Sequence, residues 1–400
     1  MAETQAKALA VTGNQAVSIA MKQIDPDVVA AYPITPQTDV VQNFSQYVAN
    51  GDVKAEFVTA ESEHSAMSAC IGSAASGART MTATSSAGYA LMVEVCYVAA
   101  SMRLPLVMTT VNRALSGPIN IHCDHSDSML GRDSGWIQIY NEDGQEAYDA
   151  TVMAFPIAEH PQVRLPVMNM YDGFIISGAI GPLRPLSDEQ VKEFIGEPPY
   201  FQNLLDSSNP ITVGPFDGLH GWYFEQKVAQ NQAMDAALDV IQEVYDRFHE
   251  LSGRRYEHLM KYRMDDAEIA LVVANSAAGT ARPVVDRLRE EGIKAGLIKV
   301  RTFRPFPVKA YAEALAGVKV VGVMDRSDSF GAPGGPIFME VLSSLYQHGN
   351  RAPALNFIYG LGGRDVFPSN IEEAFRRLDA VAKGDAEPPR ERIYLNLKGV

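Results

Sequence analysis

The 400-residue sequence contains few cysteines, no long apolar run and no cluster of basic residues. Its three cysteines, Cys70, Cys96 and Cys123, include no CxxC pair, so we expect neither a disulfide framework nor a zinc site of paired ligands. An iron–sulfur cubane normally takes four thiolates, which this chain alone does not offer in a recognisable pattern. No apolar run reaches the roughly 18 residues that cross a bilayer, and no membrane contact is expected.

Charge and the N-terminal residues exclude further classes of protein. The chain has 34 basic and 48 acidic residues and a formal net charge of −14. Because nucleic-acid binding depends on neutralising phosphates, no nucleic-acid partner is expected. The N-terminus lacks the basic start and apolar core of a secretory signal. These features predict a cytoplasmic globular protein.

Two short motifs suggest functions that their spacing does not support. GLGGRD at residues 360–365 follows an apolar run but lacks the glycine spacing of a dinucleotide fingerprint, which argues against an NAD-dependent dehydrogenase. HCDH at residues 122–125 suggests a metal, yet neighbouring side chains of an extended chain alternate in direction and cannot all face one ion. We therefore predict a hydrogen-bonded loop at 122–125 and no metal site in this chain.

Short apolar runs alternate with helical patterns through the first part of the chain, which predicts a parallel sheet covered on both faces. The expected strands are 27–32, 56–60, 79–84, 104–111 and 163–170, and the expected helices include 63–76 and 88–102. A proline-rich excursion follows near 181–221. We expect it to be ordered, with four large side chains buried: Tyr200, Phe201, Leu204 and Leu205.

A second alternating unit follows an amphipathic helix at 234–251, whose apolar residues recur every three or four positions. Its expected strands are 269–274, 295–300, 318–324 and 354–359, and its expected helices are 278–291, 308–316, 337–347 and 370–382. The predicted fold class is therefore α/β with two domains, which we place at residues 1–255 and 256–400.

Three of the predicted strands end near side chains suited to a small anion. Thr35 lies in AYPITPQT, Glu63 opens the helix after the strand at 56–60, and Arg113 follows the strand at 104–111. Open α/β sheets bind ligands at the carboxyl ends of their strands, and an arginine there can hold a carboxylate through paired hydrogen bonds. Two simpler interpretations stay open: Glu63 as an acid that complements a helix dipole, and Arg113 as a solvated arginine.

Several longer motifs make the sequence recognisable. AYPITPQT, ESEH with its small-residue helix, TATSSAGYALM and NRALSGPINIHCDHSD together resemble the α subunits of pyruvate:ferredoxin oxidoreductases, in the 2-oxoacid:acceptor oxidoreductase superfamily. The resemblance continues through RDSGWIQIY, QEAYDATVMAFPIAE and VRTFRPFP, so it covers both expected domains. It implies a pyrimidine-binding domain of a thiamine-diphosphate enzyme, followed by a domain of the transketolase C-terminal type.

The resemblance also implies roles for individual residues. Thr35 would contact the substrate, and Arg113 would hold the 2-oxoacid. Glu63 would hydrogen-bond the pyrimidine N1′ and favour the tautomer that removes the thiazolium C2 proton. Tyr32 and Pro33 would adjoin the cofactor.

The sequence lacks one motif that thiamine enzymes need, and the resemblance therefore implies partner subunits. Thiamine enzymes hold magnesium and diphosphate with a GDG motif, and no GDG occurs here. The resemblance thus implies that Mg2+ and diphosphate bind a β subunit, that the 4Fe-4S clusters lie on partner subunits, and that γ and ferredoxin-like δ subunits complete the complex.

The implied reaction is oxidative decarboxylation of pyruvate with coenzyme A to acetyl-CoA and CO2, or its reverse, with electrons passing to ferredoxin. Alternatives are the same chemistry on 2-oxoglutarate, a branched-chain 2-oxoacid or oxalate, and a non-catalytic scaffold subunit. Thr35 argues against oxalate, whose relatives carry arginine there. RALSGPIN after the arginine strand favours pyruvate over 2-oxoglutarate.

Overall fold

A seven-stranded sheet organises the first part of the computed structural model, which describes residues 8–214 and 216–399. Its strand order is β12-β6-β7-β5-β4-β2-β3, and only the pair β12–β6 is antiparallel. The strands are β2 (Val28–Ala31), β3 (Glu56–Thr59), β4 (Thr80–Thr84), β5 (Val107–Asn112), β6 (Ile137–Tyr140), β7 (Val167–Asp172) and β12 (Thr302–Arg304).

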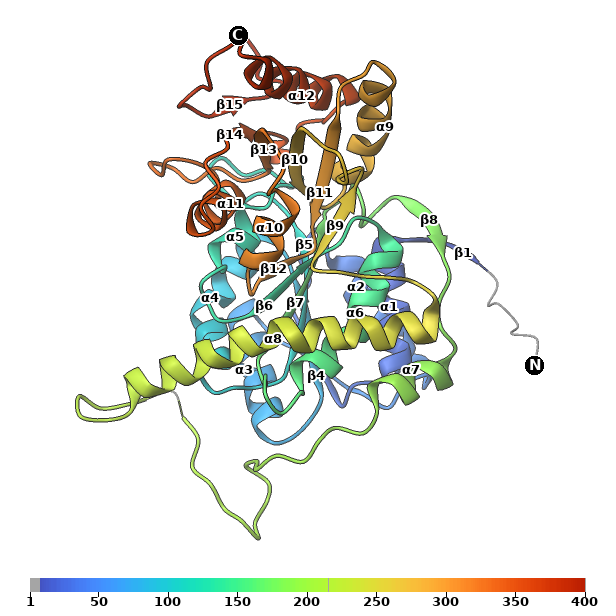
Figure 1. Cartoon of the computed structure of the whole chain (residues 1–400). Coiled ribbons are helices and arrows are strands. Elements are labelled where there is room, and N and C mark those ends of the chain that lie inside the picture. Colours follow the sequence, from blue (N-terminus) through green and yellow to red (C-terminus); the bar gives the residue numbers. More distant parts are fainter. Residues whose placement is uncertain (1–7, 215, 400) are drawn as a thin grey trace.

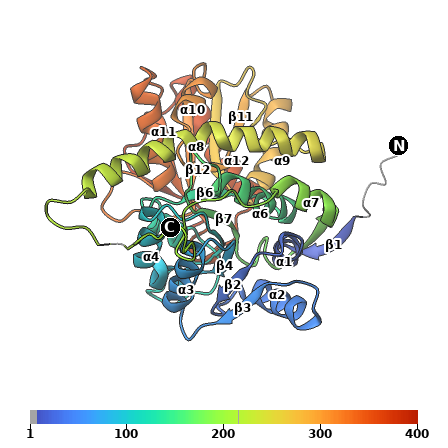
Figure 2. The same ribbon diagram turned by 90° about the horizontal axis from the view of Figure 1, so that it is seen from below.

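Helices surround this sheet in Figures 1 and 2. They are α1 (Gly13–Ile24), α2 (Thr38–Asn50), α3 (Glu63–Ala75), α4 (Ser86–Ser101), α5 (Ser126–Leu130), α6 (Gly144–Ala158), α7 (Asp188–Ile195) and α8 (Tyr223–Ser252). A two-stranded antiparallel ribbon joins β1 (Leu9–Thr12) to β8 (Ile180–Leu183). None of the helices in the described part of the chain is both long and apolar enough to span a bilayer.

A second, six-stranded sheet follows α8, in the order β15-β14-β13-β10-β11-β9. Its strands are β9 (Leu259–Tyr262), β10 (Ile269–Ala274), β11 (Ala295–Val300), β13 (Val320–Asp325), β14 (Ala354–Ile358) and β15 (Ile393–Tyr394). Its helices are α9 (Ala277–Glu290), α10 (Val308–Ala314), α11 (Pro336–Gln347), α12 (Pro368–Lys383) and the 3₁₀ turn η1 (Leu361–Gly363). The two-domain α/β fold class is confirmed.

The two sheets are not separated by a single cut of the chain. After β11 the chain returns to the first sheet, where Thr302 of β12 pairs with Ile139 of β6. Two ion pairs also join the domains. Lys299 of β11 and Arg301, which follows β11, both pair with Glu146 of α6 in the first domain. The domain limits at residue 255 stay a prediction, and the contacts between the domains are extensive.

The proline-rich excursion differs from its prediction. Tyr200 is 73% exposed, Leu205 is 76% exposed and Leu204 is also on the surface, so their expected burial is wrong. The reason is that the segment runs over the outside of α3, tied by the Leu204 N–H to the Ala75 carbonyl at 2.9 Å, rather than through the core. Phe201 alone is half-buried, and its ring lies 4.6 Å from the Arg164 guanidinium.

Candidate functional site

Thr35 and Arg113 lie together at the carboxyl edge of the first sheet. The Arg113 Nη1 donates to the Thr35 carbonyl at 2.8 Å, and Arg113 Nε donates to the Asn120 carbonyl at 3.3 Å. Arg113 is buried, and burial lowers its pKa while the nearby Asp127 opposes that shift. Within the described residues, neither Arg113 Nη2 nor the Thr35 hydroxyl has a hydrogen-bond partner, so both remain free to bind a ligand.

Asp127 fixes the chain turns beneath this pair. Its carboxylate accepts hydrogen bonds from the backbone N–H of Arg113 at 3.0 Å, of Ser86 at 3.0 Å and of Ser128 at 2.7 Å. The Asn112 amide donates a fourth bond at 2.9 Å. Burial raises the pKa of Asp127 to about 6 in spite of these donors. One carboxylate therefore holds the turns after β4 and β5 in register.

Glu63 is the first residue of α3, where Ser62 caps the helix by accepting from the Ser65 N–H. The Glu63 side chain is only 7% exposed. Among the residues that the structure describes, none donates a hydrogen bond to the Glu63 carboxylate. An acid that merely complemented the helix dipole would be expected to face water. Glu63 instead points into the protein with its hydrogen-bonding capacity unused.

The Glu63 carboxylate packs closely against the start of α4. A methyl group on Gly88 would come within 2.5 Å of Glu63 Oε1 and 2.7 Å of Thr84 Oγ1. Thr84 Oγ1 is buried and has no hydrogen-bond partner among the described residues. Glycine at position 88 thus lets the Glu63 side chain lie directly against α4, beside Thr84 at the end of β4. A buried carboxylate and a hydroxyl, neither with a partner among the described residues, fit the polar edge of an aminopyrimidine ring, as the family resemblance implies for thiamine diphosphate.

Tyr32 and Pro33 are exposed where the chain leaves β2. The strand β2 lies between β3 and β4, and β4 lies beside β5, so the turns that carry these residues and the three predicted site residues share one edge. The Gln37 amide, which donates to the Ala83 carbonyl at 2.9 Å, ties the turn after β2 to β4. Arg113 and Thr35 are in direct contact, while Glu63 lies beside Thr84 in the next turn.

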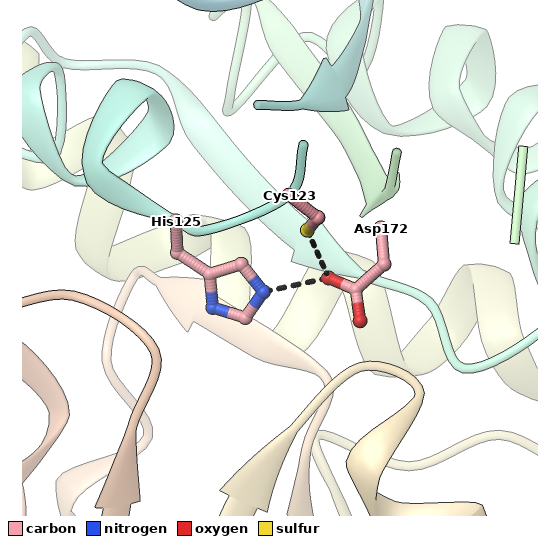
Figure 3. Close-up of side chains that lie close together, drawn as sticks. All are labelled: Cys123, His125 and Asp172. Carbon is pink, nitrogen blue, oxygen red and sulfur yellow. Dashed lines mark hydrogen bonds and ion pairs between the residues drawn. The ribbon is translucent and has the colours of Figure 1, made fainter. Parts of the chain in front are cut away.

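A buried cluster joins this edge to the second domain (Figure 3). Asp172, at the end of β7, accepts from His125 Nε2 at 2.8 Å, from Cys123 Sγ at 3.2 Å and from Asn275 Nδ2 at 2.9 Å. Arg326, which follows β13, donates Nη1 to Asp172 at 3.0 Å. Burial alone would raise the pKa of Asp172, but the charges of Arg326 and His125 hold it well below its usual range.

Two residues of the HCDH motif at 122–125 lie in this cluster, where they could be considered as metal ligands together with Asp172. One ligand atom each of Cys123, His125 and Asp172 lies within 4.8 Å of the others, because residues two apart on an extended chain face the same side. The Asp172 carboxylate, however, already pairs with the Arg326 guanidinium. Burial raises the pKa of the Cys123 thiol well above its usual value, which disfavours a metal-binding thiolate. The cluster acts as a hydrogen-bonded joint between the domains.

Sequence reasoning missed the residues that support the site. Asp127 belongs to the quoted NRALSGPINIHCDHSD segment, but its four-donor position depends on Ser86, which lies 41 positions earlier. Asp172 has no role in the sequence analysis, and its partner Arg326 is 154 positions away. Side-chain contacts at such separations have no local signature, so only the fold brings them together.

Comparison with known proteins agrees with this geometry. A family model described as pyruvate flavodoxin/ferredoxin oxidoreductase, thiamine diP-bdg, matches residues 19–246. The pyruvate:ferredoxin oxidoreductase core domain II matches residues 267–371. The pyruvate synthase subunit PorA of Thermotoga maritima is 52% identical over 98% of this chain and 98% of the relative. The ketoisovalerate oxidoreductase subunit VorA of Pyrococcus abyssi is 42% identical over 90% of this chain and 91% of the relative.

Two solved structures share the fold at low sequence identity. A 2-oxoglutarate:ferredoxin oxidoreductase from Magnetococcus marinus superposes with a TM-score of 0.70 at 21% identity, over 92% of this chain and 65% of that chain. A split-gene transketolase superposes with a TM-score of 0.56 at 12% identity, over 92% of this chain and 98% of that chain. The resemblance seen in the sequence motifs is confirmed, and the chain belongs to the pyruvate flavodoxin/ferredoxin oxidoreductase family.

Proposed function

We propose that this chain is the α-type subunit of a pyruvate synthase and contributes the 2-oxoacid site and the pyrimidine side of the thiamine-diphosphate site. The observation that carries this proposal is the pairing of Arg113 with Thr35 at the sheet edge that also holds the buried, unused carboxylate of Glu63. The relatives named pyruvate synthase subunit PorA, including the Methanocaldococcus jannaschii protein at 44% identity, support pyruvate as substrate.

The proposed reaction cleaves the bond between the carboxylate and the carbonyl carbon of pyruvate. The acetyl group is transferred to the thiol of coenzyme A, CO2 and a proton are released, and the two electrons reduce two ferredoxins. The reverse direction uses the same atoms and electrons. Thiamine diphosphate, when bound, would supply a carbon nucleophile for the keto carbon and a cationic ring that takes up the electron pair left by CO2.

Each predicted residue has a role that its surroundings support. Arg113 binds the substrate carboxylate, because its Nη2 is free and its other nitrogens are fixed by backbone carbonyls. Thr35 donates its hydroxyl to the carboxylate or keto oxygen. Glu63 shares a proton with the pyrimidine N1′, and its low exposure strengthens that hydrogen bond. Tyr32 and Pro33 would border the cofactor.

The remaining components belong to other subunits in this proposal. The sequence has no GDG motif and only three cysteines, so Mg2+ and the diphosphate group would bind a β subunit and the 4Fe-4S clusters would lie on partner chains. The γ and ferredoxin-like δ subunits and ferredoxin would carry the electrons. A cytoplasmic location also remains a prediction.

Substrate range tests the proposal directly. The chain would be co-expressed with its partner subunits, and kcat/KM would be compared for pyruvate, 2-ketoisovalerate, 2-oxoglutarate and oxalate. We expect pyruvate to be preferred over 2-oxoglutarate and oxalate, because a neutral Thr35 and a single Arg113 match one carboxylate, and over 2-ketoisovalerate, because the relatives at 52% and 44% identity are named pyruvate synthase subunits. Preference for 2-ketoisovalerate, the substrate class named for the VorA relative, would contradict the pyruvate assignment while keeping the family chemistry.

A further inference from the structure

A glycine-rich turn of the second domain is hydrogen-bonded to the loop that follows Arg113. The turn, Gly360–Gly363, comes directly after β14 and was the motif that failed as a dinucleotide fingerprint. Gly363 N–H donates to the Cys123 carbonyl at 2.7 Å, and Gly362 N–H donates to the Asp124 carboxylate at 3.1 Å. In the opposite direction, Asn120 Nδ2 of the loop donates a hydrogen bond to the Gly362 carbonyl at 2.8 Å.

Glycine is required at this contact for two reasons. Gly362 and Gly363 have φ angles of +59° and +77°, which side-chain-bearing residues rarely adopt. A Cβ on Gly363 would lie 2.3 Å from the Cβ of His122, and one on Gly362 would lie 2.5 Å from Asn120 Nδ2. Two chain segments from different domains therefore approach more closely than any other residue would allow.

Asn120 connects this contact to Arg113. Its carbonyl accepts from Arg113 Nε at 3.3 Å, and its side-chain Oδ1 accepts from the His122 N–H at 2.8 Å. The loop gains little from apolar burial, since Ile119 is 74% exposed and Ile121 is also on the surface. Its conformation therefore depends on hydrogen bonds, and three of these involve the second domain's turn.

We propose that Gly360–Gly363 is a positioning element for the substrate-binding arginine, acting through Asn120. The proposal rests on the proposed function, because it takes Arg113 as the residue that binds the 2-oxoacid. The second domain would then set the direction of the Arg113 guanidinium without touching substrate. Asn120, Gly362 and Gly363 are positioning residues in this account.

Three variants in the assembled complex test the proposal. Asn120→Asp keeps the acceptor for the His122 N–H but places an oxygen against the Gly362 carbonyl, so it removes one of the three hydrogen bonds between the loop and the turn. Gly363→Ala adds the clashing Cβ. Gly384→Ala is the matched control, because Gly384 also has a positive φ, of +78°, but nothing lies within 4 Å of its added Cβ.

Two readouts apply to every variant: amide hydrogen exchange of residues 114–124, and KM and kcat for pyruvate. We expect Asn120→Asp to speed exchange in this loop and to raise KM about 2- to 10-fold, the effect of one lost hydrogen bond, with a smaller change in kcat. Gly363→Ala should do the same more strongly. Gly384→Ala should change neither the exchange of this loop nor KM.

Four results would overturn the proposal. Unchanged exchange in both Asn120→Asp and Gly363→Ala would show that the turn does not hold the loop. Faster exchange with unchanged KM would show that the loop does not position the arginine. The same effects in Gly384→Ala would trace them to general strain. Arg113→Ala is run in parallel: if it leaves KM for pyruvate unchanged, its substrate role in the proposed function fails and the positioning role fails with it, whatever the exchange data show.

Discussion

Replacing Asp172 by asparagine should weaken the joint between the two domains. The Asp172 carboxylate is fully buried and pairs with Arg326, which is itself buried. Its other hydrogen bonds come from His125, Cys123, Asn275 and both the N–H and the hydroxyl of Ser276. Asp172→Asn would leave the guanidinium without its counter-charge and turn an amide N–H2 toward existing donors. Breaking a buried ion pair from one side costs about 3–5 kcal/mol.

This free energy converts into a measurable change in melting temperature. Unfolding entropy of about 2.1 cal/mol/K per residue over 400 residues gives about 0.8 kcal/mol/K. The expected fall in Tm is therefore about 4–6 °C. The matched control is Asp133→Asn, because Asp133 is 69% exposed and its ion pairs with Arg132 and Arg304 span 3.9 Å and 3.7 Å. A surface pair of this kind contributes about 0–1 kcal/mol, so the control should lower Tm by about 1 °C or less.

Calorimetry of these two variants, of Arg326→Gln and of the double variant Asp172→Asn/Arg326→Gln gives the test. Two facing amides can hydrogen-bond to each other, so the double variant should be less destabilised than the sum of Asp172→Asn and Arg326→Gln, by about 1 kcal/mol or more. A Tm for Asp172→Asn within about 1 °C of the wild type would refute the reasoning. So would strict additivity, because it would mean that Asp172 and Arg326 do not stabilise each other.

Other predictions address the site itself. Burial raises the pKa of Asp127 from 3.8 to about 6. The protonated carboxyl therefore stabilises the folded state fully below about pH 4, and this stabilisation is lost as the pH rises through 6. Urea unfolding free energies of the wild type and Asp127→Asn should diverge by about 3 kcal/mol between pH 4 and pH 7. Gly88→Ala should abolish pyruvate oxidation while Gly72→Ala, whose added Cβ has nothing within 4 Å, keeps activity in the same assay. Arg113→Ala should raise KM for pyruvate about 10- to 150-fold, and Arg113→Lys should restore only part of that loss, as steady-state kinetics will show.

Nine strands were predicted because they are apolar runs bounded by turns: β2, β3, β4, β5, β7, β10, β11, β13 and β14. The sequence analysis did not predict β1, β6, β8, β9, β12 and β15, each of which has four residues or fewer. Whether a helix could be predicted depended on how much of its surface is buried. The amphipathic part of α8 has a polar face and was found, whereas α6 buries 12 of its 15 residues and has no polar stripe for periodicity to detect. The exposed apolar side chains near Tyr200 were predicted wrongly, because composition gives the preference for burial but not the path of the chain.

The site was predictable as far as residues at the ends of strands go. Parallel strands place Thr35 and Arg113 at one edge, and the structure adds that the contact uses the Thr35 carbonyl rather than its hydroxyl. The supporting groups were not predictable from local sequence. Asp127 acts through backbone donors that only the fold of the first domain brings together. The Gly360–Gly363 turn acts through a close approach that depends on how the two domains face each other.

The role of Glu63 tests the central claim most directly. Proton exchange at the thiazolium C2 of bound thiamine diphosphate would be followed by NMR in the assembled complex, for the wild type and for Glu63→Gln. The account predicts exchange slower by about 10²- to 10⁴-fold in Glu63→Gln, because an amide cannot share a proton with the pyrimidine N1′, while cofactor occupancy and Tm stay near wild type. Exchange as fast as in the wild type, with the cofactor bound, would contradict the assignment of the pyrimidine site to this chain.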